Sequence, residues 1–277
     1  MIVARTVGQL GVDGVGILVP TMGALHEGHL KLIDVAKGLG RGPVVVSVFV
    51  NPTQFNDPKD LERYPRTEES DIAACEARGA NAVYLPSVEE VYPDSTDGDE
   101  AVPGGVGNGP GLEDAYRPGH FAGVRRVCRR LFQLVRTRTA VFGEKDWQQL
   151  QVIRQMVREE GIGVDIVGGE TVRCADGLAM SSRNALLDGE DRKKAARIWE
   201  VMNEMRNAHH HAEVWAAECR SAIEEEARLR LDSMGFGVEY WCLRDAETLG
   251  EPAKGRETRM LVAAELGGVR LIDNARW

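Results

Sequence analysis

The stretch Val19-Pro20-Thr21-Met22-Gly23-Ala24-Leu25-His26-Glu27-Gly28-His29-Leu30 decides the fold of this chain. The apolar run 16–19 that leads into it is typical of a buried parallel strand. Pro20, Gly23 and Gly28 then interrupt that pattern, and the apolar spacing beyond Gly28 is typical of a helix. The sequence therefore predicts a strand, a turn and the beginning of a helix.

Two histidines stand at this turn. His26 and His29 are three residues apart, so they share one face if the helix has begun. A helix N-terminus offers unpaired N–H groups and positive potential, which suit a phosphate, and two imidazoles would add donors. A capped helix with partly exposed histidines is the first alternative. A metal site is the second, but the spacing is not His-Glu-x-x-His and a third ligand is missing from the motif.

Strands and helices continue to alternate after this turn. The spacing predicts βαβ units and a parallel sheet, whereas the chain from residue 188 onward consists of long charged helices followed by strands. We therefore predict an α/β parallel-sheet domain over 1–185 and a smaller α+β domain over 186–277. The expected strands are 43–50, 81–86, 139–142, 164–167, 238–243, 259–264 and 270–274. The expected helices are 68–78, 122–136, 188–208 and 213–231, together with a helix that follows the strand 139–142 and continues to about Glu160.

Composition excludes several classes of protein. The 277 residues are 43% hydrophobic and 28% charged, which is ordinary for a globular chain. Apolar runs near the ~20 residues of a membrane span are absent from the sequence, and residues 1–10 lack a signal-peptide core. The net charge of −9 disfavours nucleic-acid binding. The five cysteines are scattered, which favours a reducing cytoplasm.

Polar residues follow two other expected strands. The amides of Asn51 and Gln54 could bind hydroxyls or carboxylates at a strand's carboxyl end, although a plain Asn-Pro turn explains them equally well. After the strand 139–142, Lys145 could neutralise a phosphate and Asp146 could accept hydrogen bonds from ribose hydroxyls. Charged residues at a helix start are also common as caps, which is the alternative here.

A third polar segment is Ser181-Ser182-Arg183. Two hydroxyls and a guanidinium could form a small anion-binding loop, and the alternative is a helix cap. An acyl-nucleophile role for either serine is disfavoured because the Gly-x-Ser-x-Gly elbow is missing. Arg117 and His120 are further phosphate candidates.

Two other regions receive structural interpretations. Four arginines of the helix 122–136 are interpreted as a solvated basic face; they are Arg125, Arg126, Arg129 and Arg130. The Gly-, Asp- and Pro-rich segment 94–111 is expected to be mobile, and we assign it no phosphate contact.

These motifs together resemble the pantothenate synthetase (pantoate–β-alanine ligase) family. The resemblance extends in the family's order over nearly the whole chain, through residues 20–29, 49–55, 63–67, 117–121, 143–146, 176–184 and 271–274. It implies a Rossmann-like nucleotidyltransferase domain, a C-terminal domain and a homodimer. It also implies an AMP-forming ligase in which pantoate and ATP give pantoyl adenylate and pyrophosphate, and β-alanine then gives pantothenate and AMP.

The resemblance also implies roles for individual residues. Catalysis would fall to His26, His29, Lys145, Ser181, Ser182 and Arg183. Pantoate would be bound by Met22, Gln54 and Gln149. ATP would be bound by Pro20, Thr21, Met22, Gly23, His29, Gly143, Lys145, Asp146, Met180, Ser181, Ser182 and Arg183. Mg²⁺ would arrive with ATP, held largely by phosphate and water, with Asp71 supporting it through water.

The chain departs from the family pattern at a few positions. Ser70 and Asp71 stand where the family often has an acidic pair, so only Asp71 carries the magnesium role over. Thr53 often is Met in the family, and 168–170 often reads Gly-Val-Pro. The alternative functions are a related nucleotidyltransferase that adenylates another small substrate and a non-catalytic adenylate-binding protein.

Overall fold

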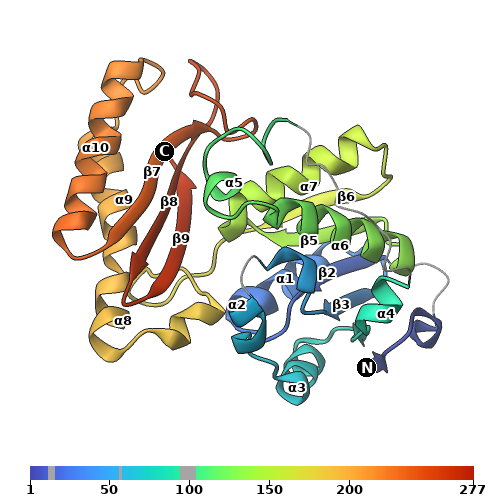
Figure 1. Cartoon of the computed structure of the whole chain (residues 1–277). Coiled ribbons are helices and arrows are strands. Elements are labelled where there is room, and N and C mark those ends of the chain that lie inside the picture. Colours follow the sequence, from blue (N-terminus) through green and yellow to red (C-terminus); the bar gives the residue numbers. More distant parts are fainter. Residues whose placement is uncertain (12–15, 56–57, 94–103) are drawn as a thin grey trace. The chain divides into compact units, whose positions relative to one another are not determined.

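A computed structural model describes residues 1–11, 16–55, 58–93 and 104–277 (Figure 1). The chain divides into two compact units. The first unit consists of Met1–Glu144 and Gln148–Glu170, and the second of Lys145–Trp147 and Thr171–Trp277. Each unit is described by itself below.

The first unit is built on a six-stranded parallel sheet, as predicted, in the order β1-β4-β3-β2-β5-β6. Successive strands run outward from β2 through β3 to β4, and the chain then returns to place β5 on the other side of β2. The boundary between β2 and β5 is therefore a topological switch point, where open α/β sheets bind ligands. The strands are β1 (Ile2–Ala4), β2 (Ile17–Thr21), β3 (Val44–Val48), β4 (Ala82–Tyr84), β5 (Thr139–Gly143) and β6 (Asp165–Gly169).

Helices cover both faces of this sheet (Figure 1). On one face, α1 (Glu27–Gly38) and α3 (Glu68–Arg78) bury Ile33 and Cys75 against strand residues such as Val46. On the other face, Phe132 of α6 (His120–Val135) lies edge-on to Phe142 of β5, with ring centroids 6.4 Å apart. The remaining elements are α2 (Pro58–Arg63), α4 (Val88–Val91), α5 (Glu113–Tyr116), α7 (Trp147–Glu159), η1 (Val7–Leu10), η2 (Pro52–Gln54) and η3 (Glu144–Asp146).

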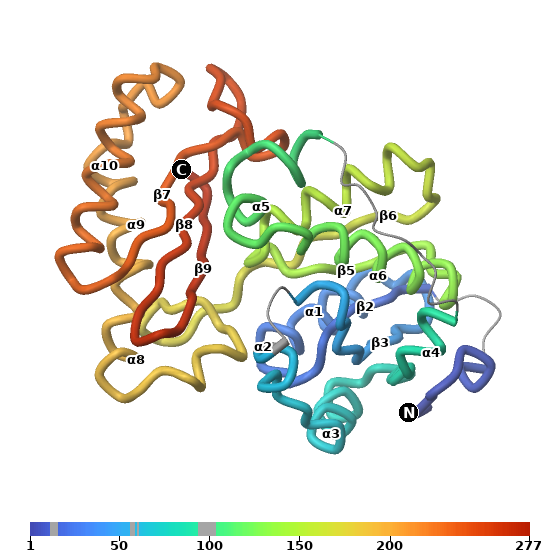
Figure 2. The backbone as a smooth tube through the Cα atoms, in the orientation of Figure 1, coloured from blue at the N-terminus to red at the C-terminus, as the bar shows by residue number. Residues whose placement is uncertain are grey.

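The second unit combines helices with a three-stranded antiparallel sheet in the order β7-β8-β9. The strands are β7 (Gly237–Asp245), β8 (Thr258–Leu266) and β9 (Val269–Arg276). Two long helices, α9 (Arg197–Ala208) and α10 (Ala217–Ser233), lie along one face of the sheet (Figure 2) and bury residues such as Met202 and Ile223 against Val262. The single helix predicted over 188–208 is two helices, α8 (Gly189–Ala195) and α9, separated at Ala196.

The division between the units differs from the predicted boundary after residue 185. Residues 171–185 belong to the second unit because they bond to its sheet and helices. Arg173 donates to both carboxylate oxygens of Asp273, at 2.6 and 2.9 Å, and its guanidinium lies over the ring of Trp199. The short segment Lys145–Trp147 also belongs to the second unit, although the residues on either side of it belong to the first.

The glycine-rich segment is described only from residue 104 onward, and the expectation of mobility for 94–103 lies outside the described residues. The described part is anchored to α7: Gln148 Nε2 donates to Val106 O at 2.8 Å, and Val106 N donates to Gln155 Oε1 at 3.2 Å. Asp114 accepts from three backbone N–H groups of 109–112, at 2.8 to 3.2 Å. Among the described residues, the helices are all too short or too polar to cross a bilayer.

Candidate active site

The two histidines stand at the N-terminus of α1 as predicted. His26 is the N-cap, and its Nδ1 accepts from Gly28 N at 3.1 Å. His29 Nδ1 lies 3.4 Å from His26 N, and the two ring centroids are 4.1 Å apart. Because both Nδ1 atoms face backbone donors, the neutral imidazoles carry their hydrogens on Nε2. The turn therefore combines two imidazole donors with the positive end of a helix.

A buried carboxylate from another helix holds this turn in shape. Asp71, near the start of α3, is 2% exposed and accepts from Leu25 N at 2.8 Å and from Ala24 N at 3.0 Å. The turn needs such support because Gly23 and Ala24 both have positive φ, 83° and 50°. A non-glycine residue in this region is strained and persists only when its surroundings hold it. Asp71 therefore positions the backbone that leads into His26.

This geometry bears on the predicted metal role of Asp71. Its Oδ1 accepts from Leu25 N and from Thr67 Oγ1, and its Oδ2 accepts from Ala24 N. Groups of three or more His, Cys, Asp or Glu side chains that could hold a metal ion are absent from the described part of the chain. Both carboxylate oxygens thus accept hydrogen bonds from the protein, so Asp71 does not fit the role of a direct metal ligand. Support of Mg²⁺ through water stays a prediction.

Two of the predicted pantoate residues lie together. Gln54 is 7% exposed, and its Nε2 is 2.7 Å from Met22 Sδ. Asn51 Nδ2 donates to Gln54 Oε1 at 3.1 Å, and its own Oδ1 accepts from Tyr92 at 3.0 Å. The Gln54 amide is therefore fixed in orientation by a buried network. The third residue, Gln149, is half-buried in the first turn of α7.

Arg117 and His120, the further phosphate candidates, contact each other and the segment of Gln54, and their phosphate role stays a prediction. His120 is 5% exposed and donates from Nδ1 to Gln54 O at 3.0 Å. Its Nε2 accepts from Arg117 Nη1 at 3.1 Å. The helix α6 can approach Gln54 this closely because residue 123 is glycine: a Cβ there would collide with Thr53 O. His120 is thus a positioning residue for the candidate pantoate site, which sequence reasoning missed.

A cavity of about 680 Å³ opens beside the histidine turn, within the range typical of small-molecule sites. Met22, Gly23 and Asp71 line it together with apolar residues such as Phe49 and Leu85, at the carboxyl ends of β2, β3 and β4. The predicted ATP residues Pro20 and Thr21 end β2, and Gly143 ends the neighbouring β5. These three therefore lie on the two strands that flank the switch point.

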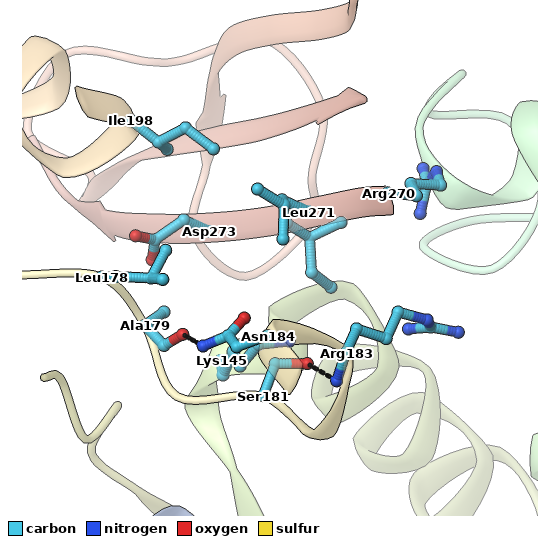
Figure 3. Close-up of a pocket in the computed structure, with 11 residues that line it drawn as sticks. Lys145, Leu178, Ala179, Ser181, Arg183, Asn184, Ile198, Arg270, Leu271 and Asp273 are labelled. Carbon is cyan, nitrogen blue, oxygen red and sulfur yellow. Dashed lines mark hydrogen bonds between the residues drawn. The ribbon is translucent and has the colours of Figure 1, made fainter. Parts of the chain in front are cut away.

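The second unit brings together three other predicted residues. Lys145, Ser181 and Arg183 line one narrow pocket, with Asn184 and Asp273 beside them (Figure 3). Ser181 caps the short helix η4 (Ser182–Leu186), and its Oγ accepts from Arg183 N at 3.3 Å. Two cationic residues and a hydroxyl from separate segments thus line one small pocket, and cations of this kind favour an anion.

Other predicted residues lie next to this pocket in the chain. Ser182 is the first residue of η4, and Met180 N donates to Val172 O at 2.9 Å. The Asp146 side chain is 47% exposed, and its Oδ1 is 3.7 Å from Lys145 Nζ. The roles assigned to Met180, Ser182 and Asp146 stay predictions.

The interpretation of the α6 arginines as a solvated face is wrong. Arg125 is 3% exposed and donates to Glu160 at 2.7 Å, and Arg129 donates to the same carboxylate. Arg126 lies over the ring of Tyr92, and Arg130 donates to Val91 O at 2.8 Å. Arg125 is buried and the other three are half-buried. Glu160, which follows α7, supplies Arg125 and Arg129 with a countercharge that the local sequence of α6 does not reveal.

Comparison with known proteins gives concordant results. Residues 5–276 match the model of the family described as Pantoate-beta-alanine ligase. The chain is 48% identical over 266 residues to a pantothenate synthetase of Nocardioides sp., covering 93% of this chain and 77% of that protein.

Two solved structures are similar over almost their whole length. A pantothenate synthetase from Thermus thermophilus superposes with a TM-score of 0.87 at 42% identity, covering 99% of both chains. A pantoate-beta-alanine ligase from Francisella tularensis, complexed with beta-gamma ATP and beta-alanine, superposes with a TM-score of 0.81 at 32% identity, covering 100% of this chain and 97% of that one. With the match over residues 5–276, these similarities show that the chain belongs to the pantoate-beta-alanine ligase family.

Proposed function

We propose that this chain condenses D-pantoate with β-alanine to give pantothenate, with cleavage of ATP to AMP and pyrophosphate. In the first step the pantoate carboxylate attacks the α-phosphorus of ATP, so that pyrophosphate leaves and pantoyl adenylate forms. In the second step the β-alanine amine attacks the acyl carbon, and AMP leaves. Family membership supports the overall reaction, and ATP and β-alanine are the ligands named for the Francisella tularensis relative.

The observation that carries the proposal is that Lys145, Ser181 and Arg183 line one pocket. The chain has a net charge of −9, so an anion can be bound only where cations are locally concentrated. We assign the triphosphate to these residues and Ser182, the ribose to Asp146, and further ATP contacts to Met180 and to the ends of β2 and β5.

The histidine turn supplies the second part of the chemistry. Adenylation leaves the protein mainly to position the reactants and to stabilise charge on the phosphorus oxygens. His26 and His29 can donate from Nε2 at the positive end of α1, and this supports a role at the α-phosphate. Preorganised donors of this kind stabilise a transition state because they need no reorientation during the reaction.

Pantoate recognition is assigned to Gln54, Gln149 and Met22. A small acid with hydroxyls needs fixed amide donors and acceptors, and the buried partners of Gln54 support such a role. Mg²⁺ would neutralise charge on the phosphates, held by phosphate and water oxygens, with Asp71 acting only through water. We further propose a homodimer in a reducing cytoplasm, where the five free cysteines would remain thiols.

The proposal is tested by AMP formation that requires both D-pantoate and β-alanine. Exchange of labelled pyrophosphate into ATP, dependent on D-pantoate, tests the first step separately. Replacing His29 or Lys145 by alanine should cost about 2 kcal/mol or more of transition-state stabilisation, roughly a 30-fold loss of exchange rate. Unchanged exchange in either variant would refute that residue's role, and a dinucleotide-like product would indicate a nucleotidyltransferase instead.

A further inference from the structure

Strand β9 carries two neighbouring polar residues that have no role in the reaction described above. Asp273 and Asn274 are 4% and 3% exposed. Because they are consecutive in a strand, they point to opposite faces of the sheet. Val262 pairs with Asp273 and belongs to the core under α9 and α10, so Asp273 is on the helix-covered face and Asn274 is on the other face.

Asn274 holds the segment that contains Lys145. Its Nδ2 donates to Lys145 O at 2.7 Å, and its Oδ1 accepts from Arg259 Nε at 2.7 Å. The Arg259 guanidinium in turn lies 3.3 Å from the centre of the Trp147 ring, and Trp147 Nε1 donates to Ala246 O. The segment is thus held at two points, the carbonyl of Lys145 and the ring of Trp147. This explains why Lys145–Trp147 belongs to the second unit.

Asp273 holds the segment that leads to Ser181. Its carboxylate accepts two hydrogen bonds from Arg173, which also donates to Gly177 O at 3.0 Å. The Arg173 guanidinium lies 3.5 Å from the centre of the Trp199 ring. The loop before Ser181 is therefore tied to β9 through a planar, bidentate contact, which fixes orientation as well as distance.

We propose that Asn274 is a positioning residue for Lys145 and that Asp273, acting through Arg173, positions the loop of Ser181. The inference rests on the phosphate-binding role proposed for this pocket. Lys145, Ser181, Arg183 and Asp273 line the same pocket. Residues of one strand, β9, therefore fix the distance between the Lys145 segment and the Ser181 loop. A triphosphate can use cations from two segments only if they are held at a fixed separation.

Asn274→Asp is the decisive variant. It is nearly isosteric and can still accept from Arg259, but it cannot donate to Lys145 O. We expect the KM for ATP to rise roughly tenfold, as for loss of a buried hydrogen bond, while the KM for β-alanine is unchanged. Asn274→Leu tests the same loss without a new negative charge. Asn81→Ala is the control, because it removes the hydrogen bond that Val44 N donates to Asn81 Oδ1 in the first unit, and it should leave the KM for ATP unchanged.

A double-mutant cycle with Lys145→Ala separates this inference from the proposed function. If Asn274 acts through Lys145, Asn274→Asp should have little further effect on ATP binding once Lys145 is alanine. Additive effects, or an unchanged KM for ATP in both Asn274 variants while Lys145→Ala raises it, would overturn the inference. An unchanged KM in Lys145→Ala itself would refute the phosphate role of Lys145 instead. If the Asn274 variants do not fold, Arg259→Lys enters the same cycle.

Discussion

In the first unit one carboxylate holds the candidate catalytic turn, whereas in the second unit two side chains of one strand hold two separate segments. Asp71 lies 46 residues from Leu25, the turn residue that it bonds. Asn274 lies 129 residues from Lys145, and Asp273 lies 100 residues from Arg173. The histidine turn is thus supported within one run of βα units. The pocket of Lys145, Ser181 and Arg183, which we propose binds phosphate, depends on segments from the whole second unit.

The largest expected effect comes from removing Arg173. In Arg173→Ala the Asp273 carboxylate would stay buried without its cation, which should lower the free energy of unfolding by about 3 kcal/mol. Urea denaturation measures this loss. Arg197→Ala is the matched control, since its ion pair with Glu200 is about 40% exposed on both sides and should contribute under about 1 kcal/mol. Equal losses of unfolding free energy in the two variants would show that the buried Arg173–Asp273 pair stabilises the fold no more than an exposed ion pair.

The corresponding change in the first unit is Asp71→Ala. Two backbone N–H groups, of Ala24 and Leu25, would lose their acceptor, at a cost of about 2 kcal/mol of stability. Pyrophosphate exchange should fall because the histidine turn is no longer fixed, and excess Mg²⁺ should not restore it. Asp34→Ala, on the surface of α1, is the control. Restoration of activity by excess Mg²⁺ would favour a metal role for Asp71 over a positioning role.

One glycine beside the histidine turn and one in the loop before Ser181 allow the packing of the two regions to be compared. Gly23 and Gly177 have φ of 83° and 91°, so alanine at either costs about 1 kcal/mol in backbone strain. An added Cβ at Gly177 would collide with the Trp199 ring, whereas at Gly23 it would lie 3.0 Å from Asp71 Oδ2. Gly161→Ala, with φ of 62° and open space around it, isolates the backbone cost. Thermal unfolding should rank the losses as Gly177, then Gly23, then Gly161, and a reversed order would contradict the packing described.

The smallest effect concerns acid stability. Burial raises the pKa of Asp114 in the first unit, but hydrogen bonds from Gln148 and the 109–112 backbone outweigh it, and the net pKa is lowered. Asp245 in the second unit likewise has a lowered pKa, because bonds from Arg256 and Thr248 outweigh burial. A lowered folded pKa gives stability that is present above the unfolded value, about 3.9, and lost as pH falls through the folded value.

Asp114→Asn and Asp245→Asn should therefore each flatten the fall in unfolding free energy between about pH 5 and pH 2. Urea denaturation at several pH values measures the slope. An undiminished slope in both variants would show that neither carboxylate contributes to acid unfolding.

Much of the architecture could be predicted because it depends on local patterns. The strand, turn and helix around His26 follow from apolar spacing and glycines, and α3 ends at Gly79 in the left-handed conformation expected of a C-cap. The parallel sheet follows from regular alternation of strands and helices. The family motifs indicated candidate residues in several segments, and three of them, Lys145, Ser181 and Arg183, line one pocket.

The remaining features depend on partners that lie far away in the chain. The pairing of Arg125 with Glu160, the bond from His120 to Gln54 O and the tie between Arg173 and Asp273 could not be read from one segment. The division between the two units differs from the predicted boundary for the same reason, since residues 171–185 contact the second unit through bonds such as that of Arg173 with Asp273.

The sequence by itself determined the strand-turn-helix around His26 and His29, the parallel sheet and the order of the candidate residues, because periodicity, glycines and strand–helix alternation are properties of neighbouring residues. Only the tertiary structure decided that Asp71 bonds to the histidine turn, that Asn274 bonds to Lys145 O and that Asp273 pairs with Arg173. A buried polar group must find its hydrogen-bond partner wherever the folded chain presents one, and that partner is chosen by topology.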